Sequence, residues 1–371
     1  MNKLKIALVK QEVYQDLYVC PVTEQDSGQI LFSSMGRVGP IALMSDLNAD
    51  FYIVKEESNK ETRIYQKVIP HIAPYLHLLK TETLDKIPGQ EFKSPGSPYP
   101  NGKYAVSCYT IDWGQYDIVI SINISLPTQL ILKYPQTLFA YMIGEANMAT
   151  GKARFGYDAT LNQMARGRIS HKCGAIDFPY TFVAKDTLEK IMQQYLGRPS
   201  ARKGIFMEIN STTERPVTRI PDHFQPLADA GYEIILHQQK IADNLKNIYD
   251  AKYFVKMGGR SIRGNSVAEA VSLGTLAIMN RDEVIHHELI IDECNVKTMD
   301  EMISLINRLE NDPELYRTLQ QKQRQVLHTY FFDAPLQSLI NCLKEKRGLS
   351  KPRTYSRWNR LFDNLYFLKL R

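Results

Sequence analysis

The stretch that decides the fold is MGGRSIRGNSVAEAVSLGTLAIMN, residues 257–280. It continues an apolar run, KYFVKM (252–257), and contains a loop with glycines, a helical pattern that ends at Gly274, and a second apolar run, TLAIMN (275–280). A strand, a helix and a strand in that order are typical of a parallel sheet with helices on its faces. The stretch therefore predicts an α/β domain in this half of the chain.

The same alternation continues on both sides of this stretch. We expect strands over 204–210 and 232–239, and helices over 186–196, 223–231, 241–251 and 298–331. Short apolar runs joined by single helices are typical of a doubly wound sheet. Residues 181–345 are predicted to form one Rossmann-like domain.

The first half shows a similar order with longer connections. Strands are expected over 4–9, 51–57, 116–125 and 136–145, and a helix over 126–133. Residues 86–103 are rich in Pro, Gly and Ser and predict a loop. We expect a second Rossmann-like domain over 1–180, with the connecting region inside or just after 146–180.

Composition excludes several classes of protein. The chain has 371 residues, 44% hydrophobic and 23% charged, as in ordinary globular proteins. Its net charge of +6 is concentrated in residues 344–371, so nucleic acid is not an expected partner of the fold. Five scattered cysteines without a CxxC pair argue against a disulfide framework or a zinc site. The apolar run Ile6 to Val9 is too short for a signal peptide, and no run approaches the roughly 18 apolar residues of a membrane span. We therefore expect a cytoplasmic protein.

The start of the helix within 257–280 has the composition of a phosphate site. Asn265 or Ser266 can cap it, and the free N–H groups of its first turn attract anions. Arg260 and Arg263 can contact a phosphate through two nitrogens, and Glu269 can accept hydrogen bonds from a ribose. A glycine-containing loop before a helix is also common in α/β proteins without such a ligand, so both interpretations stay open at this point.

The run NSVAEAVSLGTLAIMN (265–280) resembles the donor-binding motif of GT-B glycosyltransferases of group 1. The positions of that motif are filled here by Glu269, Ala270, Gly274, Thr275, Ala277 and Ile278. Ser261 and Leu276 depart from it, because retaining members of one GT-B group carry an acidic residue at the first position and the motif usually has proline at the second. Arg263, Gly264, Asn265 and Ser266 look more like exostosin-type or fucosyltransferase-type domains. The resemblance covers roughly residues 200–345.

This resemblance implies a GT-B fold: two doubly wound Rossmann-like domains with an interdomain cleft. Residues 1–180 would bind the acceptor and residues 181–345 the nucleotide sugar, with the family's ribose-binding glutamate at Glu269. The implied activity is a Leloir-type, hexosyltransferase-like transfer of sugar from a UDP- or GDP-sugar to a glycan, polysaccharide or lipid-linked acceptor. Two alternatives stay open, namely a non-catalytic nucleotide-sugar-binding partner protein and a GT-B-shaped sugar-nucleotide epimerase.

Neither a cofactor nor a metal is expected beside the nucleotide-sugar donor. No DxD pair lies in a plausible metal-binding loop, so arginines and helix N-termini would offset the diphosphate charge. After the strand predicted at 204–210, Arg215 and Arg219 are candidates for this role, and Arg215 is nearer the strand. A solvated loop is the competing interpretation for both.

The sequence offers several candidates for a catalytic base. An inverting transferase needs a carboxylate or a histidine near the acceptor hydroxyl. Glu145 follows the strand predicted at 136–145 and is the preferred candidate, with Asp46, His71 and Asp158 as rivals. A lone acidic residue after a strand is more often a helix cap or solvated.

Residues 346–371 form a basic tail with aromatic residues among the cations, including Trp358, Phe362, Tyr366 and Phe367. This pattern is typical of contact with an anionic membrane surface. The alternative, which we favour slightly, is a helix that returns to pack on the first domain. The expectation that the protein lies at the inner face of a membrane therefore rests only on residues 346–371.

Overall fold

The structure is a computed structural model, and it describes residues 4–11, 47–55, 76–80, 92–93, 104–106, 108–122, 126–143, 156–162, 176–178, 187–208, 217–238, 241–258, 265–351, 353–354, 356–358 and 361. These residues form two compact units. The first takes its described residues from Met1–Pro21, Met44–Pro179 and Ala334–Arg371, and the second from Tyr180–Asp333. No described helix is long and apolar enough to cross a membrane.

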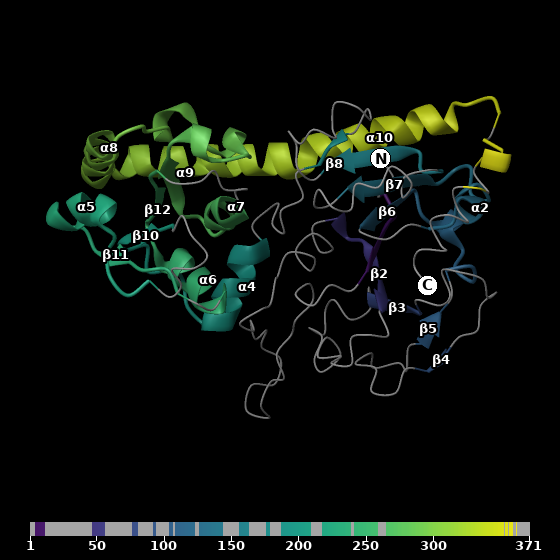
Figure 1. Cartoon of the computed structure of the whole chain (residues 1–371), viewed down its shortest axis with the longest axis horizontal. Coiled ribbons are helices and arrows are strands. Elements are labelled where there is room, and N and C mark those ends of the chain that lie inside the picture. The colour runs from purple at the N-terminus through teal and green to yellow at the C-terminus, as the bar shows by residue number, and fades with distance from the viewer. Residues whose placement is uncertain are drawn as a thin grey trace. The chain divides into compact units, whose positions relative to one another are not determined.

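The first unit contains a sheet of nine strands among the described residues, in the order β4-β5-β3-β2-β1-β6-β7-β8-β9. All neighbours pair in parallel except β4 and β5. Ile6 to Val9 of β1 and the whole of β6 are buried, as a parallel sheet covered on both faces requires. Figure 1 shows β6 beside β7 within this sheet. The strands are β1 (Ile6–Gln11), β2 (Asp50–Lys55), β3 (Leu76–Lys80), β4 (Phe92–Lys93), β5 (Tyr104–Val106), β6 (Ile118–Ile122), β7 (Leu138–Ile143), β8 (Ala159–Asn162) and β9 (Ile176–Asp177).

Trp113 lies at the centre of the core on one face of this sheet. It is fully buried within the short helix η5 (Trp113–Gln115), and its Nε1 donates to the carbonyl of Cys108 at 2.8 Å. The helix α2 (Thr128–Ile131) contributes Leu130 and Ile131 to the same cluster. A later part of the chain, α10 (Ala334–Arg347), contacts β7 and β9 and belongs to this unit.

The second unit contains a four-stranded parallel sheet in the order β11-β10-β12-β13. The strands are β10 (Ile205–Met207), β11 (Ile234–Ile235), β12 (Tyr253–Lys256) and β13 (Leu276–Met279). The helices are α4 (Thr187–Leu196), η8 (Asp222–Phe224), α5 (Gln225–Asp229), α6 (Ile241–Asp250), α7 (Asn265–Ser272), η9 (Arg281–Glu283), η10 (His287–Leu289), η11 (Asp292–Cys294), α8 (Met299–Asn311), α9 (Pro313–His328) and η12 (Thr329–Asp333).

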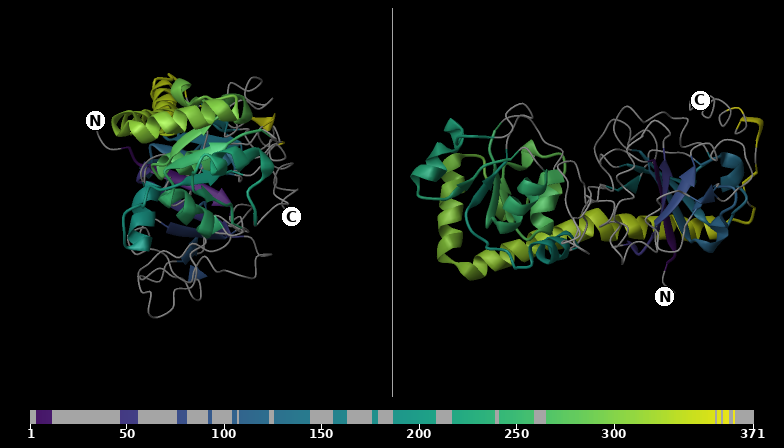
Figure 2. Two further views of the ribbon diagram at one scale, coloured as in Figure 1. Left: turned by 90° about the vertical axis from the view of Figure 1, so that its left-hand side faces the viewer. Right: turned by 90° about the horizontal axis from the view of Figure 1, so that it is seen from below.

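Helices cover both faces of this second sheet. Side chains on one face, such as Met207 and Val255, pack in a common cluster with residues of α5, α8 and α9. The alternate residues Phe206 and Phe254 point to the other face and stack with their ring centroids 5.6 Å apart. Figure 1 shows α8 and α9 on one side of the strands and α4 and α6 on the other, and the views in Figure 2 agree. The unit is therefore doubly wound.

The strand order fixes where a ligand can approach this sheet. From β10 the chain passes to β11 on one side and then crosses to β12 on the other side of β10. The connecting helices consequently lie on opposite faces of the sheet, and the strand order changes direction between β10 and β12. This switch point is the place in an open α/β sheet where ligands bind.

The predicted α/β class with two parallel-sheet units is confirmed. In the second unit each predicted strand and helix is present, with bounds that differ by a few residues. Residues 86–103 were expected to be a loop but contain β4, and 146–180 contains β8 and β9. The predicted boundaries 1–180, 181–345 and 346–371 remain predictions, although α10 makes its contacts with the first unit rather than with the second.

Candidate functional site

A row of buried ionisable side chains follows the carboxyl edge of the second sheet. His237 follows β11, Glu208 follows β10, Lys256 ends β12, and Glu283 lies in η9 just after β13. Their side chains are 6%, 6%, 0% and 15% exposed, in that order. Along the strand order β11-β10-β12-β13, a histidine is therefore followed by a carboxylate, an ammonium group and a second carboxylate. Buried ionisable groups are costly and concentrate at functional sites, so this edge is the candidate site.

Lys256 and Glu283 tie the end of β12 to the segment after β13. Lys256 Nζ donates to Glu283 Oε2 at 2.6 Å and to the carbonyl oxygen of Gly258 at 2.7 Å. The N–H of Gly258 donates to the other carboxylate oxygen, Glu283 Oε1, at 2.9 Å. Gly258 has φ of 71°, a left-handed conformation that favours glycine. The pair therefore holds the first residue of the glycine-containing loop in a fixed position.

Glu208 and His237 form a second buried pair beside the first. The N–H of Glu208 donates to the carbonyl of Val255 at 2.9 Å, which places Glu208 level with Lys256 on the neighbouring strand. His237 Nε2 lies 3.9 Å from Glu208 Oε1, and an ion pair forms there when the ring is protonated.

The other ring nitrogen of His237 is fixed from the opposite side. His237 Nδ1 lies 2.8 Å from the carbonyl oxygen of Gln238 and 3.2 Å from the side-chain amide nitrogen of Asn244, so it donates to the former or accepts from the latter according to the tautomer of the ring. Asn244 on α6 donates to the same carbonyl at 2.8 Å and accepts from the Gln238 N–H at 2.6 Å. The ring orientation is thus set by the segment after β11 together with α6.

Helix α7, the next described element after β12, begins on this edge. Its residues Val267, Ala268, Ala270 and Val271 are buried against the unit. Ser266 and Glu269 are half-buried and lie three residues apart, so they share one face of the helix. The free N–H groups of the first turn also point toward the carboxyl edge. Ser266 and Glu269 therefore lie on one face of α7, and their role as ligands of a donor remains a prediction.

The opposite end of α7 is held by two arginines and a glutamine. Arg202 donates to the carbonyl of Leu273 at 2.5 Å and to Glu189 at 2.8 Å. Arg324 donates to Glu189 as well, and Gln320 donates to the carbonyl of Gly274. Burial lowers the pKa of Arg202, while the neighbouring Tyr316 and Glu189 act in the opposite direction. Cations at the carboxyl end of a helix stabilise its dipole, so these contacts fix the position of α7.

The remaining predicted site residues lie largely outside the described residues. These are Glu145, Arg215, Arg260, Arg263 and Gly264, together with the rivals Asp46 and His71. Asn265 is described as the first residue of α7, without its side chain. Their assignments remain predictions.

Asp158, the third rival base, is described and has a different role. Its Oδ2 accepts from Lys346 Nζ at 2.8 Å and from the N–H of Phe139 at 2.7 Å, and its Oδ1 accepts from Arg353 at 2.5 Å. The side chain is 7% exposed. A carboxylate held by two cations and a backbone N–H is an anchor, and this structural role argues against Asp158 as the base.

Sequence reasoning missed the four residues of the buried row. The signal was present, since each strand of the second sheet ends in a polar residue or is followed by one within two positions: Glu208, His237, Lys256 and Asn280. Asn280 caps η9 by accepting from Asp282 N–H at 3.0 Å. The sequence does not show the order of the strands in the sheet, and this order brings the carboxyl ends of the four strands side by side. No cluster of three or more His, Cys, Asp or Glu suited to a metal ion occurs within the described part of the chain.

No protein-family model matches the sequence. The search of curated proteins gives no match either. Among solved structures, phage T4 β-glucosyltransferase in complex with UDP and Mn²⁺ is 11% identical with a TM-score of 0.38, covering 93% of this chain and 100% of its own. Sucrose-phosphate synthase from Thermosynechococcus elongatus is 12% identical with a TM-score of 0.38, covering 92% and 98%. HepE from Anabaena, in complex with UDP and glucose, is 9% identical with a TM-score of 0.38, covering 92% and 99%.

These values are too low to carry a functional argument, which must rest on this chain's own residues. What the fold and the candidate site define is a class: an α/β protein of two parallel-sheet units, with buried charges at a switch point in the second.

Proposed function

We propose that the chain is a GT-B glycosyltransferase whose second unit binds a nucleotide-sugar donor. The observation that carries the proposal is the position of α7, which starts at the carboxyl edge beside the switch point and places Ser266 and Glu269 on one half-buried face. A helix start of this kind suits a phosphate, and a glutamate one turn further in suits a ribose. The motif over 265–280 supports the same assignment.

In this proposal the diphosphate lies on residues 258–266. The backbone N–H groups at the start of α7 bind it, and Arg260 and Arg263, with Arg215, neutralise its charge. Lys256 and Glu283 contribute by holding Gly258, where this loop begins. Glu269 accepts hydrogen bonds from the ribose hydroxyls. Charge stabilisation of the leaving diphosphate then needs no metal.

The acceptor half of the reaction is assigned to residues 1–180. Glu145, two residues after the end of β7, is proposed as the base that deprotonates the acceptor hydroxyl, and the acceptor is a glycan, polysaccharide or lipid-linked sugar. Exclusion of water supports transfer over hydrolysis of the donor. We also propose a cytoplasmic location, where nucleotide sugars are the available donors.

Calorimetric titration of the full chain with UDP, GDP and CMP and with their sugar conjugates tests the donor site. Glu269→Ala should raise the dissociation constant of the preferred nucleotide by about tenfold to a hundredfold, the loss expected for hydrogen bonds to a charged group. Glu314→Ala is the matched control, because Glu314 is also a helical glutamate but is 78% exposed on α9. It should bind the nucleotide as the wild type does.

The outcomes separate the proposal from its alternatives. Equal affinity in Glu269→Ala and in the wild type would refute the ribose assignment. Nucleotide binding without sugar transfer to any acceptor would favour the non-catalytic partner protein. Conversion of the free nucleotide sugar to its epimer without an acceptor would favour the epimerase.

A further inference from the structure

The charged residues of the chain's last part are distributed unevenly. Between Lys346 and Phe362 the sequence has six basic residues and no acidic one. Three of them are bound to the first unit: Lys346 and Arg353 to Asp158, and Arg347 to Asp117 at 2.8 Å. Lys351 and Arg357 are exposed. We call residues 346–361 the C-terminal segment.

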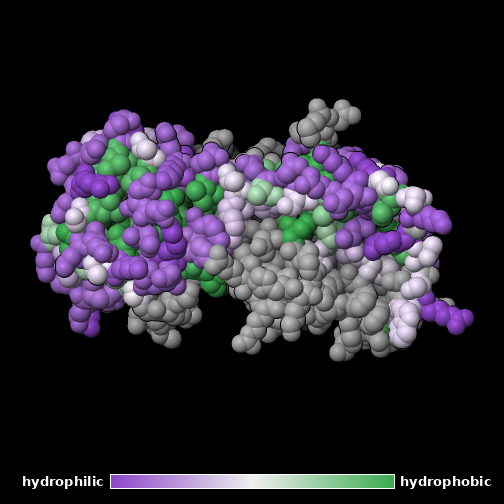
Figure 3. Space-filling model, turned by 90° about the horizontal axis from the view of Figure 1, so that it is seen from above, coloured by the Kyte–Doolittle hydropathy of each residue, from purple (hydrophilic) through white to green (hydrophobic). Residues whose placement is uncertain are grey.

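The segment also carries exposed apolar side chains. Among the described residues, the exposed large hydrophobic ones are Leu349, Trp358 and Leu361, which are 60%, 69% and 46% exposed. All three lie in this segment, whereas the face of the molecule in Figure 3 is mainly hydrophilic with scattered hydrophobic patches. Arg357, Trp358 and Leu361 have helical backbone, so Trp358 and Leu361 lie on the same side of that turn.

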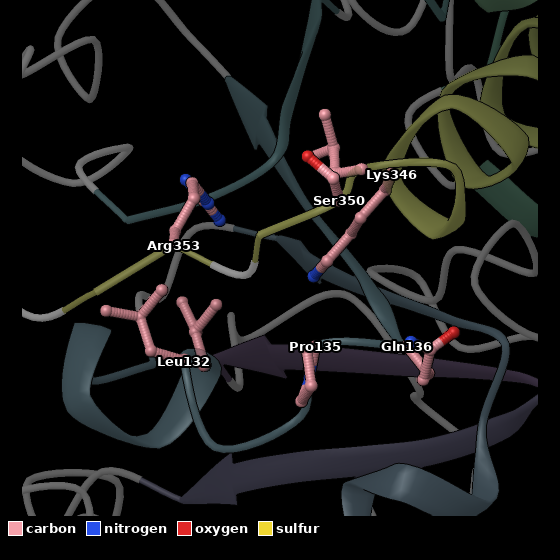
Figure 4. A pocket seen from close by; sticks show the side chains of 8 residues that line it. Leu132, Pro135, Gln136, Lys346, Ser350 and Arg353 are labelled. Carbon is pink, nitrogen blue, oxygen red and sulfur yellow. The ribbon is translucent and has the colours of Figure 1, made fainter.

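A hollow of about 270 Å³ lies between the start of this segment and the end of α2. Its walls are partly apolar, from Ile131, Leu132, Pro135 and Leu349, and partly polar, from Gln136, Lys346, Ser350 and Arg353. Figure 4 shows the Lys346 ammonium group pointing into the hollow, with Arg353 on another side of it.

The polar wall of the hollow has an excess of positive charge. Asp158 is one carboxylate shared by two cations, Lys346 and Arg353. Lys346 uses two of its three N–H donors within the described residues, on Asp158 and on the carbonyl of Thr137 at 2.5 Å. The hollow can therefore accept a phosphate oxygen at its polar wall and hydrocarbon at its apolar wall.

We propose that the C-terminal segment binds the surface of an anionic bilayer, with a lipid phosphate in this hollow and with Trp358 and Leu361 inserted at the interface. Trp358 follows Arg353 by five residues, a span of at most about 17 Å, so one patch of bilayer can contact both. Duplex DNA would also attract the cations, but it offers no favourable surface to an exposed leucine pair and a tryptophan. A bilayer interface favours both properties together.

The chain's two tryptophans make the test direct. Trp113 is fully buried and Trp358 is 69% exposed, so a change in emission on adding vesicles reports on Trp358. With vesicles of phosphatidylglycerol and phosphatidylcholine in equal parts, the full chain should sediment and its emission should shift to the blue. Vesicles of phosphatidylcholine alone should bind it weakly, and added salt should weaken binding to the anionic vesicles.

Two variants and one control separate the parts of the proposal. Trp358→Ala with Leu361→Ala should lower vesicle partitioning about tenfold, through the loss of buried apolar area. Arg357→Glu should lower it by more than about fivefold, the effect of one cation near an anionic surface. Lys203→Glu reverses the charge of a side chain that is 81% exposed in the second unit, and it should leave partitioning unchanged.

Three results would overturn the proposal: no sedimentation of the wild type with anionic vesicles, unchanged partitioning in both variants, or binding to a short DNA duplex without binding to vesicles. The test does not depend on the donor site, because nucleotide affinity is measured separately and neither variant touches the second unit.

Discussion

At the scale of single residues, the most informative side chain is Lys256. It is fully buried at the end of β12, and a buried ammonium is tolerated only when acceptors surround it. Glu283 and the Gly258 carbonyl supply those acceptors. Such a pair adds little net stability compared with apolar residues, so its presence at the switch point suggests that it serves the geometry of the loop.

Lys256→Met should reduce the free energy of unfolding by about 3 kcal/mol, because Glu283 keeps its charge in a mostly buried position without its partner. Urea unfolding followed by circular dichroism measures the change. Lys203→Met, on the exposed surface, should change it by less than about 0.5 kcal/mol. The double variant Lys256→Met with Glu283→Gln should have a free energy of unfolding at least about 1 kcal/mol higher than Lys256→Met alone, because no unpaired charge is left buried. Strictly additive losses would show that the two side chains are not coupled.

At the scale of elements, α7 is fixed at both ends by different means. Its first turn begins at Asn265, and its last turn leads into Gly274, which has φ of 79° and ends the helix. The predicted closure of this helix at Gly274 is confirmed. The side chains of Arg202, from the segment between α4 and β10, and of Arg324, from α9, both lie against this glycine. Gly274 therefore has close neighbours in addition to a left-handed backbone conformation.

Gly274→Ala should therefore lower the free energy of unfolding by more than a Gly→Ala substitution at a left-handed glycine that has no close neighbours. A Cβ at Gly274 would lie 2.4 Å from Arg202 Nη2 and 2.6 Å from Arg324 Nη2, and both arginines are tied to Glu189. Gly231 is the matched control, since it has φ of 90° and no atom within 4 Å of the added carbon. We expect a loss of about 1 kcal/mol for Gly231→Ala from backbone conformation alone and about 2–3 kcal/mol for Gly274→Ala. Equal losses in thermal or urea unfolding would contradict the role of the arginines.

At the scale of the whole molecule, the chain leaves the second unit at η12 and ends on the first. α10 and the segment after it are attached through Asp158, Asp117 and the backbone around Gly156. Burial lowers the pKa of Lys346, although Asp158 acts to raise it. The expectation that the basic tail returns to the first domain is met by Lys346, Arg347 and Arg353, and the described apolar residues beyond them remain exposed.

Asp158→Asn should loosen this attachment, because it removes the carboxylate that both Lys346 and Arg353 bind. The cost should be about 2–4 kcal/mol for the first unit, as for other partly buried charge networks. Limited trypsin digestion should then cut after Lys346 and Arg347 at least about tenfold faster, since local opening is more frequent by that factor or more. Asp292→Asn, which also breaks an ion pair but at an 88% exposed side chain, should leave the digestion pattern unchanged. Equal digestion of both variants would contradict the anchoring role.

The sequence by itself determined the class of the fold. Runs such as IFM (205–207) and YFV (253–255) are apolar because both faces of a parallel strand are covered, and Gly274 marks a helix end because few other residues adopt its backbone conformation. Those are local causes, and they can be seen in the order of residues. The same holds for the motif at the start of α7.

Only the tertiary structure decided which polar residues share a site. His237, Glu208, Lys256 and Glu283 come from four separate places in the chain, and they meet because the strand order is β11-β10-β12-β13 and not the order of the sequence. It likewise decided that Asp158 is an anchor, because its partners Lys346 and Arg353 lie nearly 200 residues further along the chain. Side-chain periodicity shows which face of a strand is buried, whereas pairing between distant strands depends on packing that no single segment contains.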